Sequence, residues 1–286
     1  MKNDPVRNNS GSFLVLLGAI AFSLGGLFIK LIPLNPITIN SARCVFSSLI
    51  IGSYMYFSRH RLKINRTVIF GAIFVFLMLL CYVVSNKLTS AANAIVLEYT
   101  APILVVIFEA VFFKKKPNTL TIIICLLVII GIGIVVLDGI ASGNFLGDMI
   151  ALASGVFYAL TMMLNDFDNS DSLSSVFLGH LFTALIGIPL FGSVLELKTE
   201  TLLLIAALGI FQAGLGYTLL TVGLKRCEPV TGSLMACIEP VLNPILVAIF
   251  YKEYLNTKQL IGCMIVIVSI IIYNVYSSKS SKDKLS

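Results

Sequence analysis

Residues 119–138 read TLTIIICLLVIIGIGIVVLD, an apolar run whose only charged residue is its last, Asp138. A helix of about 20 residues crosses the ~30 Å hydrocarbon core of a bilayer. Backbone polar groups find no water there, so the run must form a helix or a strand of a closed barrel. Barrel strands alternate apolar and polar residues. This run does not alternate, and it therefore predicts a transmembrane helix.

Nine further apolar segments of similar length flank this run on both sides. Clusters of Pro, Gly and Asn separate them, as at 33–36 and 142–144, and such clusters are typical of turns. The pattern predicts an all-α membrane protein with ten transmembrane helices. We place them at 12–32, 37–57, 67–86, 90–113, 119–138, 147–164, 174–195, 201–223, 230–251 and 258–276.

The composition argues against a soluble protein. The chain is 58% hydrophobic and 12% charged, whereas soluble domains are roughly half apolar and about a quarter charged. The net charge of +6 comes from basic residues in short loops, where they orient helices. We therefore expect a lipid bilayer as partner and no nucleic acid. The six Cys form no CxxC pair and no Cys/His metal spacing, so no metal site is expected.

The distribution of Lys and Arg predicts the topology. If the N-terminus is cytoplasmic, most of the basic residues lie in cytoplasmic segments, including the clusters at 59–66 and 114–116. This bias predicts a multi-pass protein of the cell (inner) membrane with both termini cytoplasmic. The loop 165–171 argues weakly against it, because it holds three Asp residues and no base.

The chain contains an internal repeat. Pro102 is followed by ILVVIFEAVFFKK and Pro240 by VLNPILVAIFYKE. Alignment of the two prolines divides the chain into repeats at 1–140 and 141–286, each with five predicted helices. An odd number of helices makes the second repeat enter the membrane from the opposite side. Inverted repeats with a site between them near the midplane are a recurrent design of carriers, so the repeat favours transport.

The same residues carry a family resemblance. Ile238-Glu239-Pro240-Val241, followed by Glu253 in YKEYLN, resembles the end of an EamA-type domain, and Tyr99-Thr-Ala-Pro102-Ile103 repeats the pattern in the first half. The resemblance is to the drug/metabolite transporter superfamily. It implies a ten-helix carrier with a central cavity lined mainly by helices 1, 3, 4, 6, 8 and 9, and no ATP. We expect no cofactor. Lys115 departs from the family, which usually has an acidic residue at that position.

Glu98 is the leading candidate for substrate binding. A charge in the bilayer interior is costly, so such residues usually face a cavity or a partner. If 90–113 is one straight helix, Pro102 and Glu109 share the face of Glu98, and the two carboxylates lie roughly 16 Å apart. Pro102 would free the carbonyl of Glu98 and loosen the helix beside the site. Glu109 would lie nearer the cytoplasm.

Other polar residues extend the candidate site. Glu239, before Pro240 in the repeat partner of helix 4, fits substrate contact as well as a structural or gating role. Arg43 would bind a carboxylate bidentately or clamp an acidic partner; the resemblance makes helix 2 peripheral, which favours the structural role. Hydrogen bonds and aromatic walls would come from Asn93, Tyr82, Tyr99, Tyr158, Gln212 and Tyr217.

These observations predict a secondary transporter of a small-molecule substrate, a metabolite moved by alternating access, rather than an enzyme. The expected cavity holds more acidic than basic residues. This excess suggests a ligand that contains an amine or ammonium group, or a ligand that is exchanged for a proton as coupling ion. The main alternative is an amino-acid or drug exporter that recognises a zwitterion, with Arg43 as the cationic group. A channel and an integral-membrane lipid enzyme are remote alternatives. Monomer and homodimer both stay open.

Overall fold

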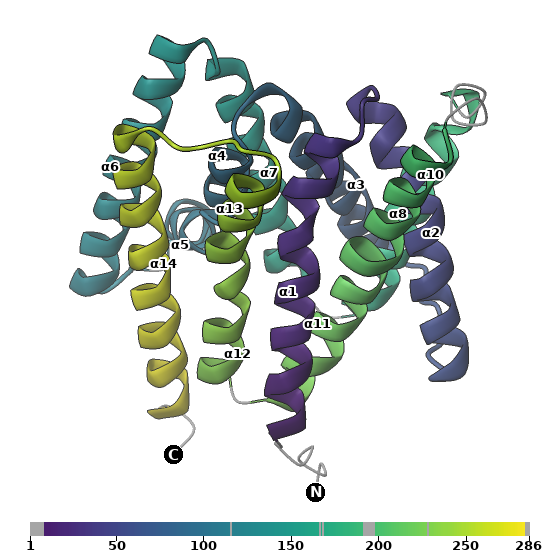
Figure 1. The fold of residues 1–286 in the computed structure, drawn as a ribbon. Coiled ribbons are helices and arrows are strands. Elements are labelled where there is room, and N and C mark those ends of the chain that lie inside the picture. Colours follow the sequence, from purple (N-terminus) through teal and green to yellow (C-terminus); the bar gives the residue numbers. More distant parts are fainter. Residues whose placement is uncertain are drawn as a thin grey trace, which may run out of the picture.

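A computed structural model describes residues 9–114, 116–165, 167, 169–190, 198–227 and 229–283. This part of the chain forms a bundle of helices without strands (Figure 1). In the first half the helices are α1 (Asn9–Leu31), α2 (Pro36–Phe57), α3 (Arg66–Leu88), α4 (Ala91–Glu98), α5 (Ala101–Phe112) and α6 (Thr119–Ser142).

The second half begins with α7 (Phe145–Asn165) and α8 (Ser172–Ile186), followed by a short 3-10 helix, η1 (Ile188–Leu190). A long interrupted segment then consists of α10 (Thr199–Ala207), the π-helix η2 (Leu208–Leu215) and α11 (Gly216–Arg226). The last helices are α12 (Pro229–Ala236), α13 (Ile238–Phe250) and α14 (Thr257–Asp283).

The all-α, ten-helix prediction is confirmed. Among the described residues, 7 helical segments are long and apolar enough to cross a membrane, counting α4 with α5 and α10 with η2 and α11 as one segment each. Two shorter apolar segments, α8 and α12–α13, and the more polar α2 complete the ten. The start of α1 and the end of α14 lie at the same end of the bundle, as an even number of crossings requires (Figure 1).

Asparagine, serine and aspartate side chains set several helix starts. Asn35 precedes Pro36 and accepts a hydrogen bond from the backbone N–H of Ile37, at the first turn of α2. Asn65 and Asn118 cap α3 and α6 in the same way. These side chains satisfy donors that have no partner inside the helix.

The two repeats pack against each other symmetrically. α3 packs on α7 as α1 packs on α11, and α1 contacts α12 and α13 as α7 contacts α4 and α5. α6 and α14, the last helices of the two repeats, pair with each other, and so do α2 and α8. The pattern is unchanged when the repeats are exchanged, as expected of two inverted repeats.

One pair of glycines shows the symmetry at atomic scale. A Cβ on Gly11 would lie 2.6 Å from the backbone carbonyl carbon of Arg226, and a Cβ on Gly147 would lie 2.6 Å from that of Leu88. Each glycine therefore lets the first helix of its own repeat begin in direct contact with the backbone of the other repeat.

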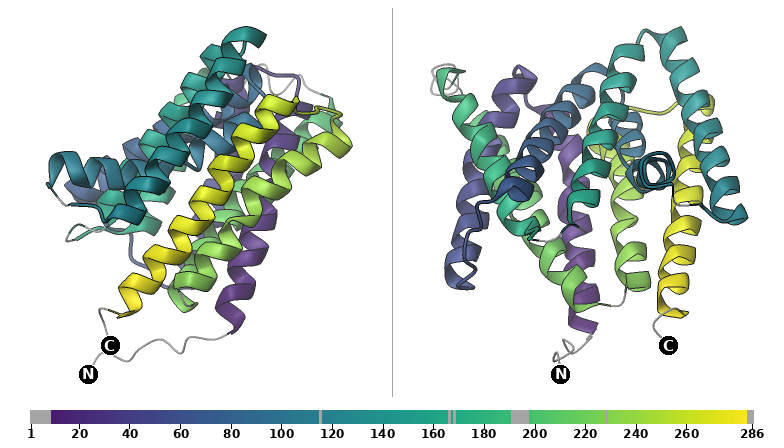
Figure 2. Two further views of the ribbon diagram at one scale, coloured as in Figure 1. Left: turned by 90° about the vertical axis from the view of Figure 1, so that its left-hand side faces the viewer. Right: turned by 180° about the vertical axis from the view of Figure 1, so that it is seen from behind.

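The prediction of one continuous helix at 90–113 is wrong. α4 ends at Glu98 and α5 restarts after Thr100, whose hydroxyl donates to the Leu97 carbonyl at 2.6 Å. Pro102 lies in the first turn of α5, where a missing N–H costs nothing. α5 consequently runs across the bundle and is seen end-on in the right-hand view of Figure 2. Glu98 and Glu109 therefore do not share the face of one straight helix.

The segment predicted at 230–251 is also interrupted, at Cys237 between α12 and α13. The segment predicted at 201–223 is helical throughout but contains the π-helix η2; π segments inside α-helices are frequent at functional sites. The segment predicted at 174–195 ends earlier, because α8 stops at Ile186. Residues 191–197 lie outside the described residues.

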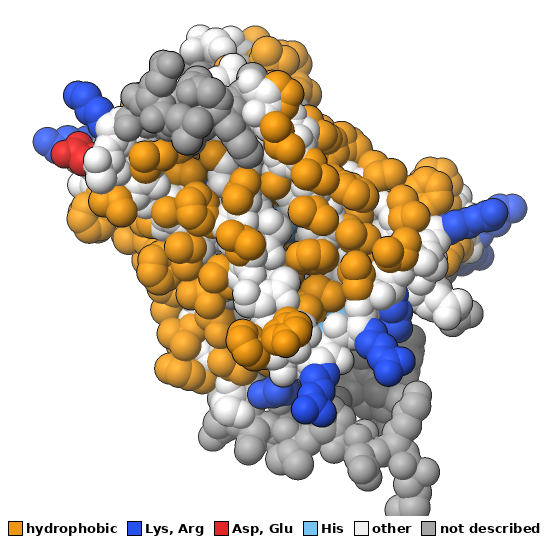
Figure 3. All heavy atoms as spheres, turned by 90° about the vertical axis from the view of Figure 1, so that its right-hand side faces the viewer, with side chains coloured by type: hydrophobic (Ala, Val, Ile, Leu, Met, Phe, Trp, Pro, Cys, Tyr) orange, Lys and Arg blue, Asp and Glu red, His pale blue; other side chains and the backbone are white. Residues whose placement is uncertain are grey.

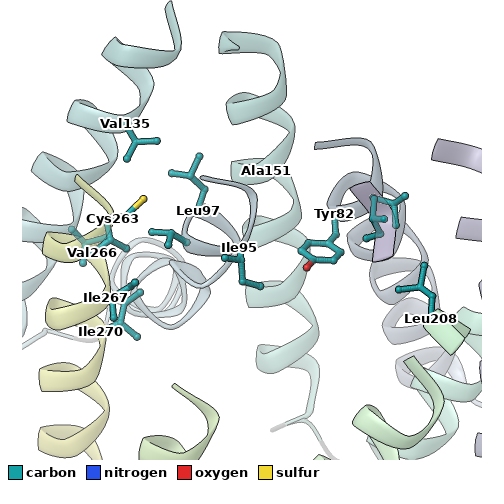
Figure 4. Close-up of a cluster of buried hydrophobic side chains, with 14 of the residues drawn as sticks. Tyr82, Ile95, Leu97, Val135, Ala151, Leu208, Cys263, Val266, Ile267 and Ile270 are labelled. Atoms are coloured by element: carbon teal, nitrogen blue, oxygen red, sulfur yellow. The ribbon is translucent and has the colours of Figure 1, made fainter. Parts of the chain in front are cut away.

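The largest buried cluster lies around α4. Ile95 and Leu97 are packed with Val135 of α6, Ala151 of α7 and Cys263 of α14 (Figure 4). This packing holds α4 in place from several sides, although it has only eight residues.

The outer surface is mainly apolar. On the face shown in Figure 3, Lys and Arg side chains lie around the margins and hydrophobic side chains cover most of the middle. Exposed residues of α6 such as Ile123, Leu126 and Ile130 agree with this picture. Such a surface suits contact with lipid tails, with charges kept at the water boundaries.

Candidate functional site

A cavity of about 260 Å³ lies between the two repeats. Its wall comes from α1, α3, the α4–α5 break, α7, η2 with α11 and the α12–α13 break, and also from α2 and α14. Seven of the eight residues predicted to bind substrate line it: Glu98, Tyr99, Tyr82, Glu239, Tyr158, Gln212 and Tyr217. Their role in binding stays a prediction.

The two helix breaks meet in this cavity. Tyr99 follows the end of α4, and Glu239 lies in the first turn of α13. The Tyr99 hydroxyl is 2.6 Å from Glu239 Oε2, to which it donates a hydrogen bond. One carboxylate of the cavity thus already has a partner from the opposite repeat.

The second carboxylate has a free oxygen. Glu98 is only 9% exposed, and its Oε2 atom forms no hydrogen bond with any described residue. A buried acceptor without a partner costs free energy in the resting structure. A ligand that donates to this oxygen would remove that cost, so Glu98 is well suited to hold a donor group or a proton.

Arg43 also lines the cavity, although helix 2 was expected to be peripheral. Its side chain is fully buried. Nε and one terminal nitrogen donate to Asn40 Oδ1 at 3.1 and 3.0 Å, and the other donates to Gln212 Oε1 at 2.9 Å. Arg43 is the one residue that α2 contributes to the described wall of the cavity, and it reaches the wall because α2 packs on η2, which brings Gln212 to the guanidinium. Both partners are neutral amides, so neither neutralises the charge.

Aromatic rings form one side of the cavity. Tyr217 lies edge-to-face with Phe22, at a centroid distance of 4.8 Å, and with His180 at 5.1 Å. The side-chain amide of Asn243 donates a hydrogen bond to the Tyr82 hydroxyl at 3.5 Å. These rings offer faces for a cationic or apolar group.

Three predicted residues lie elsewhere. Asn93 donates to Asp148 Oδ1 at 3.1 Å and does not line the cavity. Glu109 lies in α5, beyond the helix break, and Pro240 lies in α13; neither belongs to the cavity wall. Pro102 does line it.

Sequence reasoning missed several cavity residues, including Met78, Met162 and Asn274. The methionines resemble ordinary core residues, and no signal in the sequence separates them. Asn274 lies in the last predicted helix, and as a polar residue in an apolar run it could have been found.

The cavity extends toward the end of the bundle where the chain starts and finishes. Leu224 and Met162, which line it, lie in the last turns of α11 and α7. The end of α11 is placed there by the contact of Gly11 with the backbone of Arg226.

A layer of polar contacts lies at the opposite end. Lys30 Nζ is 2.7 Å from Glu253 Oε2 and donates to the Thr89 carbonyl at 2.8 Å. The backbone N–H of Ala91 donates to Glu253 Oε1 at 2.7 Å. Lys87 Nζ donates to the Ile32 carbonyl at 2.6 Å. These contacts tie the ends of α1, α3 and α13 together.

Known proteins resemble this chain in sequence and fold. An uncharacterized transporter of Clostridium kluyveri is 24% identical over 216 residues, 68% of this chain and 67% of that protein. The uncharacterized transporter YxxF of Bacillus subtilis is 25% identical over 62% of this chain and 60% of its own length. The human solute carrier family 35 member G1 is 24% identical over 54% of this chain and 47% of its own length.

A solved crystal structure shares the fold, with a TM-score of 0.62 and 17% identity over 92% of this chain and 96% of that one. The sequence profile of the EamA-like transporter family matches residues 9–137 and 145–275, which is most of the chain in two successive copies. The chain is thus a multi-pass membrane protein and belongs to the EamA-like transporter family.

Proposed function

We propose that this protein is a secondary carrier whose substrate is a small amine- or ammonium-containing metabolite bound in the central cavity. The observation that carries the proposal is the Oε2 atom of Glu98, a buried oxygen of a cavity-lining carboxylate that has no hydrogen-bond partner among the described residues. A cationic nitrogen would supply both a donor and the opposite charge. The tyrosine rings around it would hold the alkyl groups of such a ligand.

Transport would proceed by alternating access. The cavity extends toward the end that carries both termini, and a polar layer lies between the two repeats at the other end. The bias of Lys and Arg supports a cytoplasmic location for the termini in the cell membrane. On this basis the structure corresponds to an inward-facing state, and Glu98 would bind a proton when it has no substrate.

Arg43 supports a second candidate, an exporter of amino acids or other zwitterions. Its guanidinium lines the same cavity, and its described partners are neutral. An amino acid would place its carboxylate near Arg43 and its ammonium near Glu98.

The two candidates differ in the ligands that stabilise the purified protein. We would measure melting temperatures with butylamine, tetramethylammonium, leucine and, as an uncharged control, 1-butanol. A ligand at 100 times its Kd adds about 2.7 kcal/mol of stability. Stabilisation by the two cations but not by butanol supports the amine carrier, and stabilisation by leucine alone supports the zwitterion carrier.

The same screen on two variants tests the site. Glu98→Gln should lose the response to cations, because the charge that attracts them is gone. Glu109→Gln removes a carboxylate outside the cavity wall and should respond as the wild type does. An unchanged response in Glu98→Gln would refute the assignment of Glu98.

A further inference from the structure

Glu253 connects the two repeats at the end of the bundle opposite the start of α1 and the end of α14. Its Oε2 atom pairs with Lys30 at 2.7 Å, and its Oε1 atom accepts the N–H of Ala91 at 2.7 Å. Lys30 and Ala91 belong to the first repeat, whereas Glu253 follows α13 in the second. The Lys30 and Glu253 side chains are 11% and 21% exposed, so solvent screens this pair less than a pair on the surface.

The contact with Ala91 lies at the N-terminus of α4. The first N–H groups of a helix lack partners within it, and the helix dipole favours a negative charge there. The Ser90 side chain accepts the N–H of Asn93, and Glu253 accepts that of Ala91. Glu253 thus caps a second N–H group at the start of α4 and places a negative charge there.

The other end of α4 is the candidate substrate site. The helix has eight residues, all buried, and its last residue is Glu98. At 1.5 Å per residue, Ala91 and Glu98 are about 10 Å apart along its axis. The break at 99–100 separates α4 from α5, so the direct connection between Glu253 and Glu98 runs through α4 alone.

We propose that Glu253 is a positioning residue that keeps this end of the carrier closed, and that α4 couples it to Glu98. The proposal rests on the proposed carrier function. A ligand at Glu98 shifts α4, weakens the contact of Ala91 with Glu253 and favours opening at this end. Coupling is reciprocal, so release of Glu253 also changes the position of Glu98 in the cavity.

Lys87 provides a matched control. Like Lys30, it is a lysine of the same polar layer with its Nζ on a backbone carbonyl, at 2.6 Å from Ile32. Its partner lies in its own repeat. Removal of Lys87 therefore perturbs the layer without breaking a contact between the repeats.

Cys237 reports which end of the cavity is open. It lines the cavity at the α12–α13 break. In full-length protein with the other five cysteines replaced by serine or alanine, we would measure its labelling by a membrane-impermeant methanethiosulfonate. Sealed membrane vesicles of both orientations would be used, and protease cleavage of an N-terminal tag would identify the side of the chain ends.

We expect the wild type to be labelled mainly from the side of the chain ends. Glu253→Gln and Lys30→Met should each raise labelling from the opposite side roughly tenfold, which corresponds to a shift of about 1.4 kcal/mol in the access equilibrium. Lys87→Met should label as the wild type does. Wild-type labelling of both Glu253→Gln and Lys30→Met, or an equal effect of Lys87→Met, would overturn the role of Glu253. If one of the two variants does not fold, the other decides.

The coupling through α4 has its own readout. Glu98→Gln removes the charge that a bound cation would neutralise, and it should raise labelling from the opposite side about threefold, whereas Glu109→Gln should not. No change in Glu98→Gln would refute the coupling and leave the role of Glu253 intact. Labelling needs no substrate, so these outcomes are separate from the ligand screen that tests the carrier function.

Discussion

The Tyr99 hydroxyl donates a 2.6 Å hydrogen bond to Glu239 Oε2, and this bond joins the two interrupted helices where each is broken. Tyr99→Phe removes the donor and leaves a buried carboxylate with one partner fewer. We expect the free energy of unfolding to fall by about 1–3 kcal/mol, measured by denaturation in detergent. Tyr158→Phe is the control, because it removes a hydroxyl from another tyrosine that lines the same cavity. An equal loss in both variants would show that the bond contributes nothing specific.

The bond between Arg43 and Gln212 joins the first repeat to the second. Arg43→Met and Gln212→Leu should each destabilise the protein, because each leaves a buried polar group without its partner. The double variant should lose less than the sum, with a coupling energy of about 1 kcal/mol. Additive losses would mean that the two side chains do not interact in the membrane.

Glycines test the close approach of the two repeats. Gly147→Ala places a Cβ 2.6 Å from the Leu88 backbone. A backbone atom cannot rotate out of the way as the end of a flexible side chain can. We expect a loss of about 1–3 kcal/mol, seen as a lower melting temperature. Gly133→Ala is the control: a Cβ there meets nothing within 4 Å, so the variant should be neutral or slightly more stable. A stable Gly147→Ala would contradict this packing.

The environment of Asp171 predicts how the stability of the fold depends on pH. It caps α8 through the Ser174 N–H at 2.9 Å and lies 3.1 Å from His60 Nε2. Burial alone would raise the pKa of this carboxyl, but the hydrogen bond from Ser174 and the neighbouring His60 outweigh it, so the pKa lies below its usual value. A depressed pKa stabilises the fold above the unfolded-state pKa of about 3.9, and this contribution is lost as the pH falls through the lower folded-state pKa.

The comparison of Asp171→Asn with the wild type removes this charge and keeps His60, one cause of the lowered pKa, in place. The asparagine keeps the cap but cannot ionise. The difference in melting temperature should shrink as the pH falls below about pH 4. A difference that grows as the pH falls would have the wrong sign for a depressed pKa.

The ten helices and the repeat could be predicted because hydrophobic length and turn residues act locally. The helix breaks could not be predicted as such. Pro102 was expected to loosen one helix, but it starts a new one, because Thr100 closes a turn onto Leu97 first. Whether the helix continues or breaks at this point depends on how α5 packs in the bundle. The boundary of the repeats at residue 140 remains a prediction.

The candidate site was predictable where intramembrane polarity marks a residue, as at Glu98 and Glu239. The same criterion, polarity inside the membrane, also selected Asn93. The Asn93 side chain instead donates a hydrogen bond to Asp148, which lies in the first turn of α7. The sequence does not connect Lys30 with Glu253, because the two residues lie more than two hundred positions apart in the chain. Only the packing of the repeats brings them together.

The polarity of α2 has a consequence for biogenesis. This helix is not among the segments apolar enough to cross a membrane by themselves, and it carries the fully buried Arg43. During synthesis α2 leaves the ribosome long before Gln212, the partner that satisfies Arg43 from the second half. Its stable insertion therefore depends on sequence that is translated later. Ribosome-bound chains that end before η2 should hold α2 only loosely in the membrane, and they should be the stage at which membrane chaperones and quality-control proteases act on this protein.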